Sequence, residues 1–241
     1  GSGASFTFDG TKLVLKLKGD NIAVGDNPID YARIAVYVDG KRVVDEMIDC
    51  AEKEVTVIDR TESAKSVVEI IKLSESPMSA VGIEAFAEGS AEALPEKPLK
   101  IEFIGDSITC GYGVDDEDEN HQFTTATEDV TKAYAYKTAK ALDAEYSMFS
   151  ASGYGIVSGY TEGDEPISEQ TIPQFYCSYG FSRGNFAGTA PQDIPWDFSK
   201  YIPQIIVINL GTNDDSYCRD HKDRQAVFSK LYADFLAVVR G

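Results

Sequence analysis

The sequence predicts an α/β protein with two domains, a β-sandwich followed by a domain built on a parallel sheet. Three observations support this. In residues 1–94, apolar and polar residues alternate in short runs separated by turn signals, which is typical of antiparallel strands with one buried face. Residues 95–98, Pro-Glu-Lys-Pro, form a linker. From residue 99 to residue 241, short apolar runs alternate with helical patterns, which indicates β-α-β units.

The N-terminal domain is expected to contain many short strands. One hairpin is especially clear, because Asp39-Gly40 separates two such runs and this dipeptide suits a two-residue turn with positive φ. Short strands with alternating faces predict a β-sandwich of jelly-roll type. From the alternation we expect strands over residues 5–8, 12–17, 31–38, 41–44, 54–58, 67–73 and 79–87.

The C-terminal domain is expected to combine three strands with two helices. The run 205–210 is almost wholly apolar, as expected of a strand covered by helices on both faces. Thr125 and Glu128 have capping-box spacing before the first helix. The strands are expected over 101–104, 146–150 and 205–210, and the helices over 131–142 and from about residue 220. The last helix aligns Val227, Phe228, Leu231, Tyr232, Phe235 and Val239 on one face.

Composition excludes several classes of partner. The 22 basic and 40 acidic residues give a formal net charge of −18, and such a surface repels nucleic acid. The sequence has no apolar run of the ~20 residues that a transmembrane helix needs, so no membrane partner is expected. Residues 1–5 lack the basic and apolar stretches of a signal peptide.

Neither a metal nor a cofactor is expected. The acidic run 115–119 lacks the alternating carboxylates and central glycine of a calcium loop. The four cysteines show no CxxC spacing that would indicate zinc. Free, mostly buried thiols are favoured over two disulfides, because a chain of this length needs no covalent staples. The four are Cys50, Cys110, Cys177 and Cys218.

Polar residues and glycines follow each of the three predicted parallel strands. Gly-Asp-Ser-Ile-Thr (105–109) follows the first strand, Ser-Gly-Tyr-Gly (152–155) the second, and Gly-Thr-Asn-Asp (211–214) the third. Because the carboxyl ends of parallel strands meet at one edge of a sheet, these segments are expected to converge. Alone, each is an ordinary helix cap, loop or turn. Their order and shared position make the combination specific.

The combination suits acyl transfer. Ser107 would be the nucleophile, at a strand-to-helix turn where its own backbone N–H is free. Gly153 would offer a second N–H, and Asn213 a neutral side-chain donor. With Ser107, they would form an oxyanion hole, in which one donor typically contributes a factor of ~10²–10³ to the rate. Asp106 is expected to orient the turn.

These segments resemble the SGNH hydrolase superfamily, and more closely carbohydrate esterase family two. The similarity covers nearly the whole chain, including the N-terminal jelly roll. It implies a flavodoxin-like three-layer α/β/α domain and an extracellular enzyme that removes acetyl groups from plant polysaccharides such as xylan or mannan. Tyr154 and Trp196 are candidates for a sugar subsite, although packing against the sheet is favoured for Trp196. The similar segments are 101–113 (IEFIGDSITCGYG), 125–142 (TATEDVTKAYAYKTAKAL), 196–200 (WDFSK) and 207–214 (VINLGTND).

The chain departs from the family pattern at its C-terminus. The family's general base is a histidine after the last strand of the hydrolase domain, whereas His121 and His221 lie in other contexts and are expected to be solvated. Only three of about five strands can be found. We therefore expect 99–241 to be a partial hydrolase domain, completed by a further segment or a second chain that supplies the histidine.

Two alternatives to a polysaccharide deacetylase remain. A lipase or thioesterase acting on other small acyl esters would use the same machinery, although the chain shows no long apolar lid. A non-catalytic carbohydrate-binding protein would fit the jelly roll and the absent base. An intact set of oxyanion donors argues against a pure binder.

Overall fold

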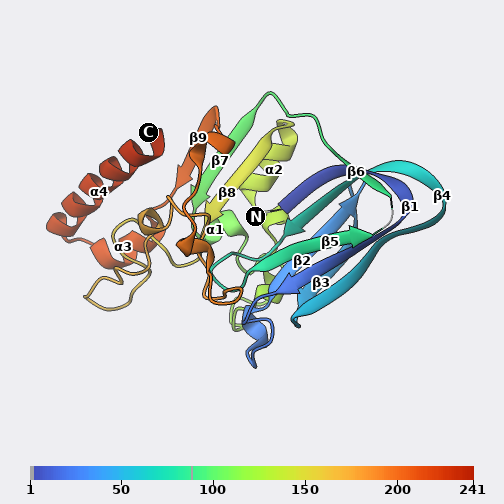
Figure 1. Cartoon of the computed structure of the whole chain (residues 1–241). Helices are drawn as coiled ribbons and strands as arrows, with labels where there is room; N and C mark the ends of the chain where they lie inside the picture. The colour runs from blue at the N-terminus through green and yellow to red at the C-terminus, as the bar shows by residue number, and fades with distance from the viewer. Residues whose placement is uncertain (1–2, 88) are drawn as a thin grey trace.

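The computed structural model describes residues 3–87 and 89–241 (Figure 1). Strands fill the N-terminal part, residues 3–93, whereas the C-terminal part, residues 99–241, combines a small sheet with helices. This confirms the predicted fold class. The N-terminal strands are β1 (Gly3–Gly19), β2 (Ala32–Val38), β3 (Lys41–Ile48), β4 (Glu52–Lys72), β5 (Val81–Ala87) and β6 (Ser90–Ala93).

The N-terminal strands form one antiparallel sheet with the order β3-β2-β4-β1-β5, and β6 also pairs with β1. The predicted runs 5–8 and 12–17 are parts of one long strand, β1. The run 54–58 and residues 67–72 of the run 67–73 both lie in β4. The pairing of β1 with β4 shifts register between Gly10 and Lys12. Such a bulge lets a strand bend without ending. Asp9-Gly10, a dipeptide typical of turns, therefore does not separate two strands.

The alternation of β1 is explained by its burial. Phe8, Leu13, Leu15 and Leu17 are each at most 1% exposed and belong to one apolar core with side chains from β2, β3 and β4. The Asp39-Gly40 hairpin is confirmed: both residues have positive φ, and Val38 pairs with Lys41 across the turn.

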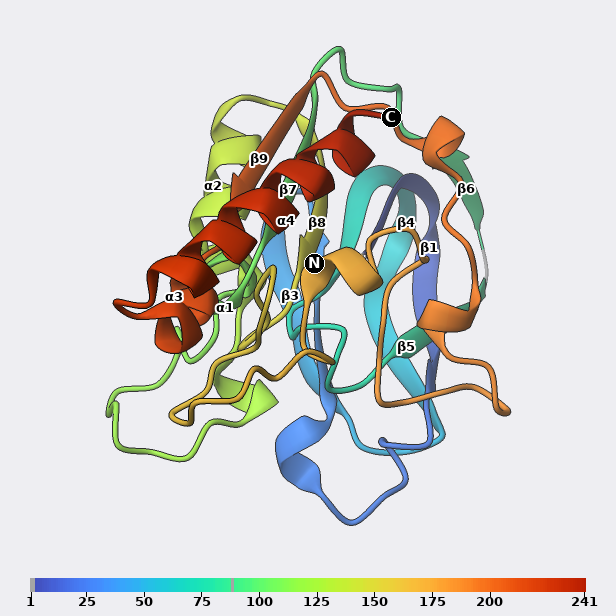
Figure 2. The same ribbon diagram turned by 90° about the vertical axis from the view of Figure 1, so that its left-hand side faces the viewer.

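The C-terminal part has a parallel three-stranded sheet between helices (Figure 2). Its order is β8-β7-β9. Ala135 and Ala139 of one helix, α2, pack on one face of the sheet, and Phe235 of another, α4, packs on the other. The strands are β7 (Lys100–Gly105), β8 (Glu145–Ser150) and β9 (Ile205–Asn209); the α-helices are α1 (Ser107–Cys110), α2 (Tyr134–Ala141), α3 (Thr212–Cys218) and α4 (Lys222–Arg240). Short 3₁₀ turns cover Pro28–Asp30, Thr125–Thr127, Val130–Lys132, Ile172–Gln174, Pro191–Asp193 and Phe198–Lys200.

Three predictions for this part are corrected. The helix expected over 131–142 is shorter, because a 3₁₀ turn precedes α2. The capping box is wrong, because the Thr125 hydroxyl donates to the Ile29 carbonyl and the Glu128 carboxylate is buried without a hydrogen-bond partner. The apolar face of α4 is narrower than predicted, since Val227 is 49% and Leu231 38% exposed.

Hydrogen bonds and apolar packing join the two parts of the chain. The Arg33 guanidinium donates to Asp115 at 2.9 Å, and that of Arg42 donates to Asp129 at 2.8 Å. Both arginines lie in the N-terminal sheet, whereas both aspartates lie in the loop between α1 and α2. The contacts fix this loop against the N-terminal sheet. Apolar side chains from the two parts also form a shared cluster: Ala35, Ile71, Leu73, Val130 and Tyr136.

No helix in the described ranges is long and apolar enough to cross a membrane. The cysteines are free thiols as predicted, but they are not mostly buried: Cys110 and Cys218 are buried, Cys50 is half-buried and Cys177 is exposed.

Candidate active site

The three strand ends lie level with one another. Gly105 at the end of β7 pairs in register with Ser150 of β8 and with Asn209 of β9. Ser107, Gly153 and Asn213 follow these residues by two, three and four positions. The parallel register therefore brings the three candidate residues to the same edge of the sheet, as their positions predict.

Ser107 is the first residue of α1, and its helix is capped by Asp106. The Asp106 carboxylate accepts a hydrogen bond from the Ile108 N–H at 3.0 Å, which is the N-cap interaction that satisfies one free donor of the helix start. Asp106 is fully buried, and this burial raises the pKa of its carboxyl. Gly105 is required just before this turn, because a Cβ there would lie 2.0 Å from the Thr109 hydroxyl.

Gly153 occupies a turn that suits glycine. Its φ is +81°, a conformation that other residues rarely adopt, and its carbonyl accepts from the Tyr160 N–H at 2.8 Å. In the described part of the chain, the backbone N–H groups of Ser107 and Gly153 have no hydrogen-bond acceptor. Both are therefore free to donate to a ligand.

Asn213 lies in the first turn of α3 and is 7% exposed. Its Nδ2 donates to the Tyr154 carbonyl at 2.8 Å. This bond uses one of the two amide hydrogens and fixes the plane of the amide, so the second hydrogen has a defined direction. The same bond connects α3 to the loop that carries Gly153.

The adjacent Asp214 anchors this loop and was missed by sequence reasoning. Its carboxylate, 1% exposed, accepts from the N–H groups of Ile156, Val157 and Ser158 at distances of 2.6–3.2 Å. The sequence did contain a signal for it, because a second polar residue follows Asn213 directly at a helix start. There, one side chain can face the site while the next faces the loop. Asp214 thus holds the residues that follow Gly153.

The two candidate sugar contacts lie in different surroundings. The Tyr154 ring packs against Phe175 and Phe181, with centroids 6.3 and 5.0 Å away. Trp196 is half-buried beside Tyr179 and lines a cavity of about 770 Å³ between β8 and the N-terminal sheet. The structure shows Tyr154 packed against other aromatic rings. Contact of Tyr154 or Trp196 with sugar stays a prediction.

The two histidines lie outside this set of contacts. His121 is exposed, and its Nδ1 lies 2.8 Å from the Asp116 carboxylate. His221 is the exposed residue that precedes α4. The acidic run is engaged in ion pairs, since Asp115 pairs with both Arg33 and Lys132.

Comparison with known proteins identifies the family of this chain. Residues 101–241 match a family model described as GDSL-like lipase/acylhydrolase. The chain is 31% identical over 243 residues to the cellulase/esterase CelE of Acetivibrio thermocellus, covering 100% of this chain and 27% of that protein. It is 30% identical over 213 residues to an acetylxylan esterase/glucomannan deacetylase of Cellvibrio japonicus, covering 86% of this chain and 53% of that protein.

The chain thus spans about a quarter and about half of the lengths of these two relatives. Its fold is close to that of a family two carbohydrate esterase from Clostridium thermocellum in complex with cellohexaose, with a TM-score of 0.80 and 28% identity. That match covers 100% of this chain and 67% of the other. With a serine at the strand-to-helix turn and the family pattern running from β7 through α4, the chain belongs to the GDSL-like lipase/acylhydrolase family.

Proposed function

We propose that this protein is a carbohydrate esterase that removes O-acetyl groups from plant cell-wall polysaccharide, with xylan or mannan as the substrate class. The observation that carries the proposal is the convergence of Ser107 with two unengaged backbone N–H groups and one oriented amide at a single sheet edge. The relatives named as acetylxylan esterase and glucomannan deacetylase support the substrate class. The reaction would take place outside the cell, where this polymer lies.

In the proposed reaction the Ser107 hydroxyl attacks the acetyl carbonyl. The negative charge that develops on the carbonyl oxygen is held by the N–H groups of Ser107 and Gly153 and by Nδ2 of Asn213. All three donors are neutral and are fixed before the substrate binds, which is the arrangement that stabilises a tetrahedral intermediate. The bond between the acetyl carbon and the sugar oxygen breaks, and the sugar leaves as an alcohol with the proton taken from Ser107. Water then releases acetate from the serine.

This reaction needs a general base for the serine proton, and a histidine suits that role near neutral pH. Neither His121 nor His221 is hydrogen-bonded to Ser107 in the described structure. We therefore propose that the base comes from outside residues 1–241, from a further segment or a second chain. If residues 1–241 alone hydrolysed esters as fast as the full-length protein, this assignment would be wrong.

A series of p-nitrophenyl esters tests the substrate class, with acetylated xylan and glucomannan as polymer substrates. The full-length protein should prefer acetate to longer acyl chains and release acetate from a polymer, and Ser107→Ala should reduce both activities to background. Preference for acyl chains of eight carbons or more would indicate a lipase instead.

Labelling with a fluorophosphonate separates the esterase from a carbohydrate-binding protein. An adduct on Ser107, located by mass spectrometry, is expected. Absence of the adduct together with measurable binding of xylo-oligosaccharides would overturn the catalytic assignment.

A further inference from the structure

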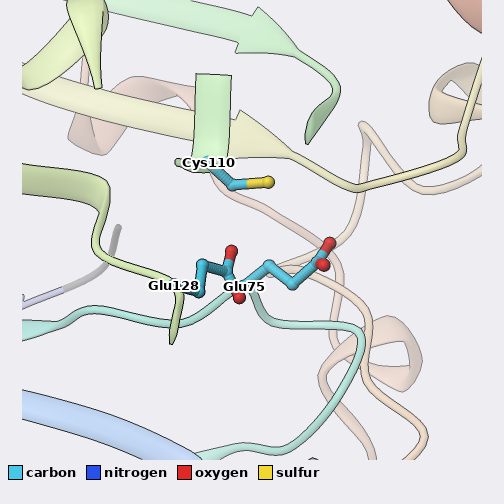
Figure 3. Close-up of side chains that lie close together, drawn as sticks. All are labelled: Glu75, Cys110 and Glu128. Atoms are coloured by element: carbon cyan, nitrogen blue, oxygen red, sulfur yellow. The ribbon is translucent and has the colours of Figure 1, made fainter. Parts of the chain in front are cut away.

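A buried polar cluster joins the two parts of the chain beside the loop of Gly153. Glu75, which follows β4, meets Cys110 of α1 and Glu128 of the loop before α2, and the three ligand atoms lie within 4.8 Å of one another (Figure 3). All three residues are buried. Figure 3 shows that the three side chains come from three separate segments of the chain.

The Glu75 side chain reaches the loop that carries the proposed oxyanion donor. Its Oε2 accepts a hydrogen bond from the Ser152 N–H at 2.6 Å, across 77 positions of sequence. The Ser152 hydroxyl lies 3.3 Å from the Cys110 sulfur. Ser152 directly precedes Gly153, so a carboxylate from the N-terminal part fixes the residue before the Gly153 N–H.

The position of Glu75 is itself held by a buried ammonium group. Lys72 is 7% exposed, and its Nζ donates to the carbonyls of Ser74 and Glu75 at 2.7 and 2.8 Å. These bonds close the chain after β4 into a tight turn and place a positive charge beside the cluster. The Lys72 ammonium attracts the carboxylates of Glu128 and Glu75, although burial lowers the pKa of this lysine to about 8.

Glu128 completes the cluster, and its burial favours the neutral form of the carboxyl group. Among the residues that the structure describes, neither carboxylate oxygen of Glu128 has a hydrogen-bond partner. Burial raises the pKa of Glu128 to about 8. Burial also raises the pKa of Glu75. The remaining Glu75 oxygen, Oε1, is also buried without a partner. At position 75, either a charged or a neutral oxygen acceptor can therefore accept the hydrogen bond from the Ser152 N–H.

We propose that Glu75 is a positioning residue for the oxyanion hole, through its hydrogen bond to the Ser152 N–H. The loop is then held on both sides of Gly153: by Glu75 at Ser152 and by Asp214 at residues 156–158. The N-terminal part thereby belongs to the catalytic unit. This inference rests on the proposed role of the Gly153 N–H.

Two variants distinguish the effect of the length of the Glu75 side chain from the effect of its charge. Glu75→Gln keeps an oxygen acceptor at the same distance and removes the charge, so kcat should stay within about 3-fold of the wild type. Glu75→Asp keeps the charge but withdraws the carboxylate by one methylene, so kcat should fall by about 10-fold or more with KM changed less than 3-fold. Loss of one oxyanion donor typically lowers kcat by a factor of ~10²–10³. A donor that is only displaced should lower kcat by less.

Glu69→Asp is the matched control. Glu69 crosses the same interface, accepting from Lys140 and from the Tyr146 hydroxyl at 3.0 Å each, and has no hydrogen bond to the Gly153 loop. Shortening Glu69 should leave kcat within about 2-fold of the wild type. If Glu75→Gln lost more activity than Glu75→Asp, or if Glu69→Asp lost as much as Glu75→Asp, the proposal would be overturned.

Amide hydrogen exchange gives a readout that does not depend on activity. The Ser152 amide should exchange at least 10-fold faster in Glu75→Asp than in Glu75→Gln, with the wild-type rate in Glu69→Asp. Equal Ser152 exchange in the two Glu75 variants would refute the positioning role. If the wild-type protein hydrolysed no ester, the proposed function would fail, and exchange would still decide whether Glu75 holds the turn.

Discussion

Removing the Asp214 carboxylate should destabilise the loop around the candidate site more than any surface change. Asp214 is 1% exposed and accepts hydrogen bonds from three consecutive N–H groups, those of Ile156, Val157 and Ser158. Ile156 and Ser158 are themselves buried. In Asp214→Ala these two donors would lose their acceptor in a place that water does not readily reach.

The size of the effect follows from these contacts. A hydrogen bond to a charged group contributes about 1.5–3 kcal/mol, and a buried donor left unpaired costs about 1–3 kcal/mol. Two buried donors and one half-buried donor then give a loss on the order of 4 kcal/mol in the free energy of unfolding for Asp214→Ala. Asp214→Asn keeps one oxygen acceptor and should lose about half as much.

Urea unfolding followed by circular dichroism measures this loss, with the m-value checked for constancy. Asp215→Ala is the control, since Asp215 is exposed and adjacent; it should stay within about 0.5 kcal/mol of the wild type. Exchange of the amides of residues 156–158 should rise in Asp214→Ala and stay unchanged in Asp215→Ala. A loss below about 1 kcal/mol for Asp214→Ala would refute the anchoring role.

Three further predictions follow from the site and from the cluster beside it. Asn213→Ala should lower kcat on p-nitrophenyl acetate by ~10²–10³; a change below 3-fold would remove Asn213 from the oxyanion hole. Gly105→Ala should destabilise the fold by about 3 kcal/mol in urea unfolding, because the added methyl meets the buried Thr109 hydroxyl, and an unchanged midpoint would contradict this. The pKa of Glu128 is raised to about 8 from 4.5, so the folded protein keeps a proton that the unfolded chain releases, and stability falls as pH rises from about 5 to 8. Glu128→Gln should flatten that fall in Tm against pH, and parallel curves for the two proteins would contradict it.

Local sequence patterns predicted most of the elements because those patterns are themselves local. The alternation in β1 reports burial of every second side chain, and Asp39-Gly40 encodes a turn by its own backbone preference. Where the prediction was wrong, a longer-range effect decided the outcome. The bulge after Gly10 lets β1 pass through a turn signal, because its pairing with β4 continues on the far side.

In the candidate site, too, residues placed by local patterns were predictable, and a residue placed by a long-range contact was not. Ser107, Gly153 and Asn213 were predictable because each stands at the end of a strand, and parallel pairing alone makes strand ends meet. Asp214 was within reach of the same logic. Glu75 was not, because its partner Ser152 lies 77 positions away and nothing in the residues around Glu75 indicates that bond.

The contacts that hold the loop of Gly153 are long-range for a physical reason. A donor to an oxyanion must be free before substrate arrives, so the fold holds it through its neighbours. Here the two holding groups are buried carboxylates that accept backbone N–H bonds on either side of Gly153, one from α3 and one from the segment after β4. Because the second crosses the interface, disturbing the N-terminal part should impair the acyl-transfer step even where no sugar contact is lost.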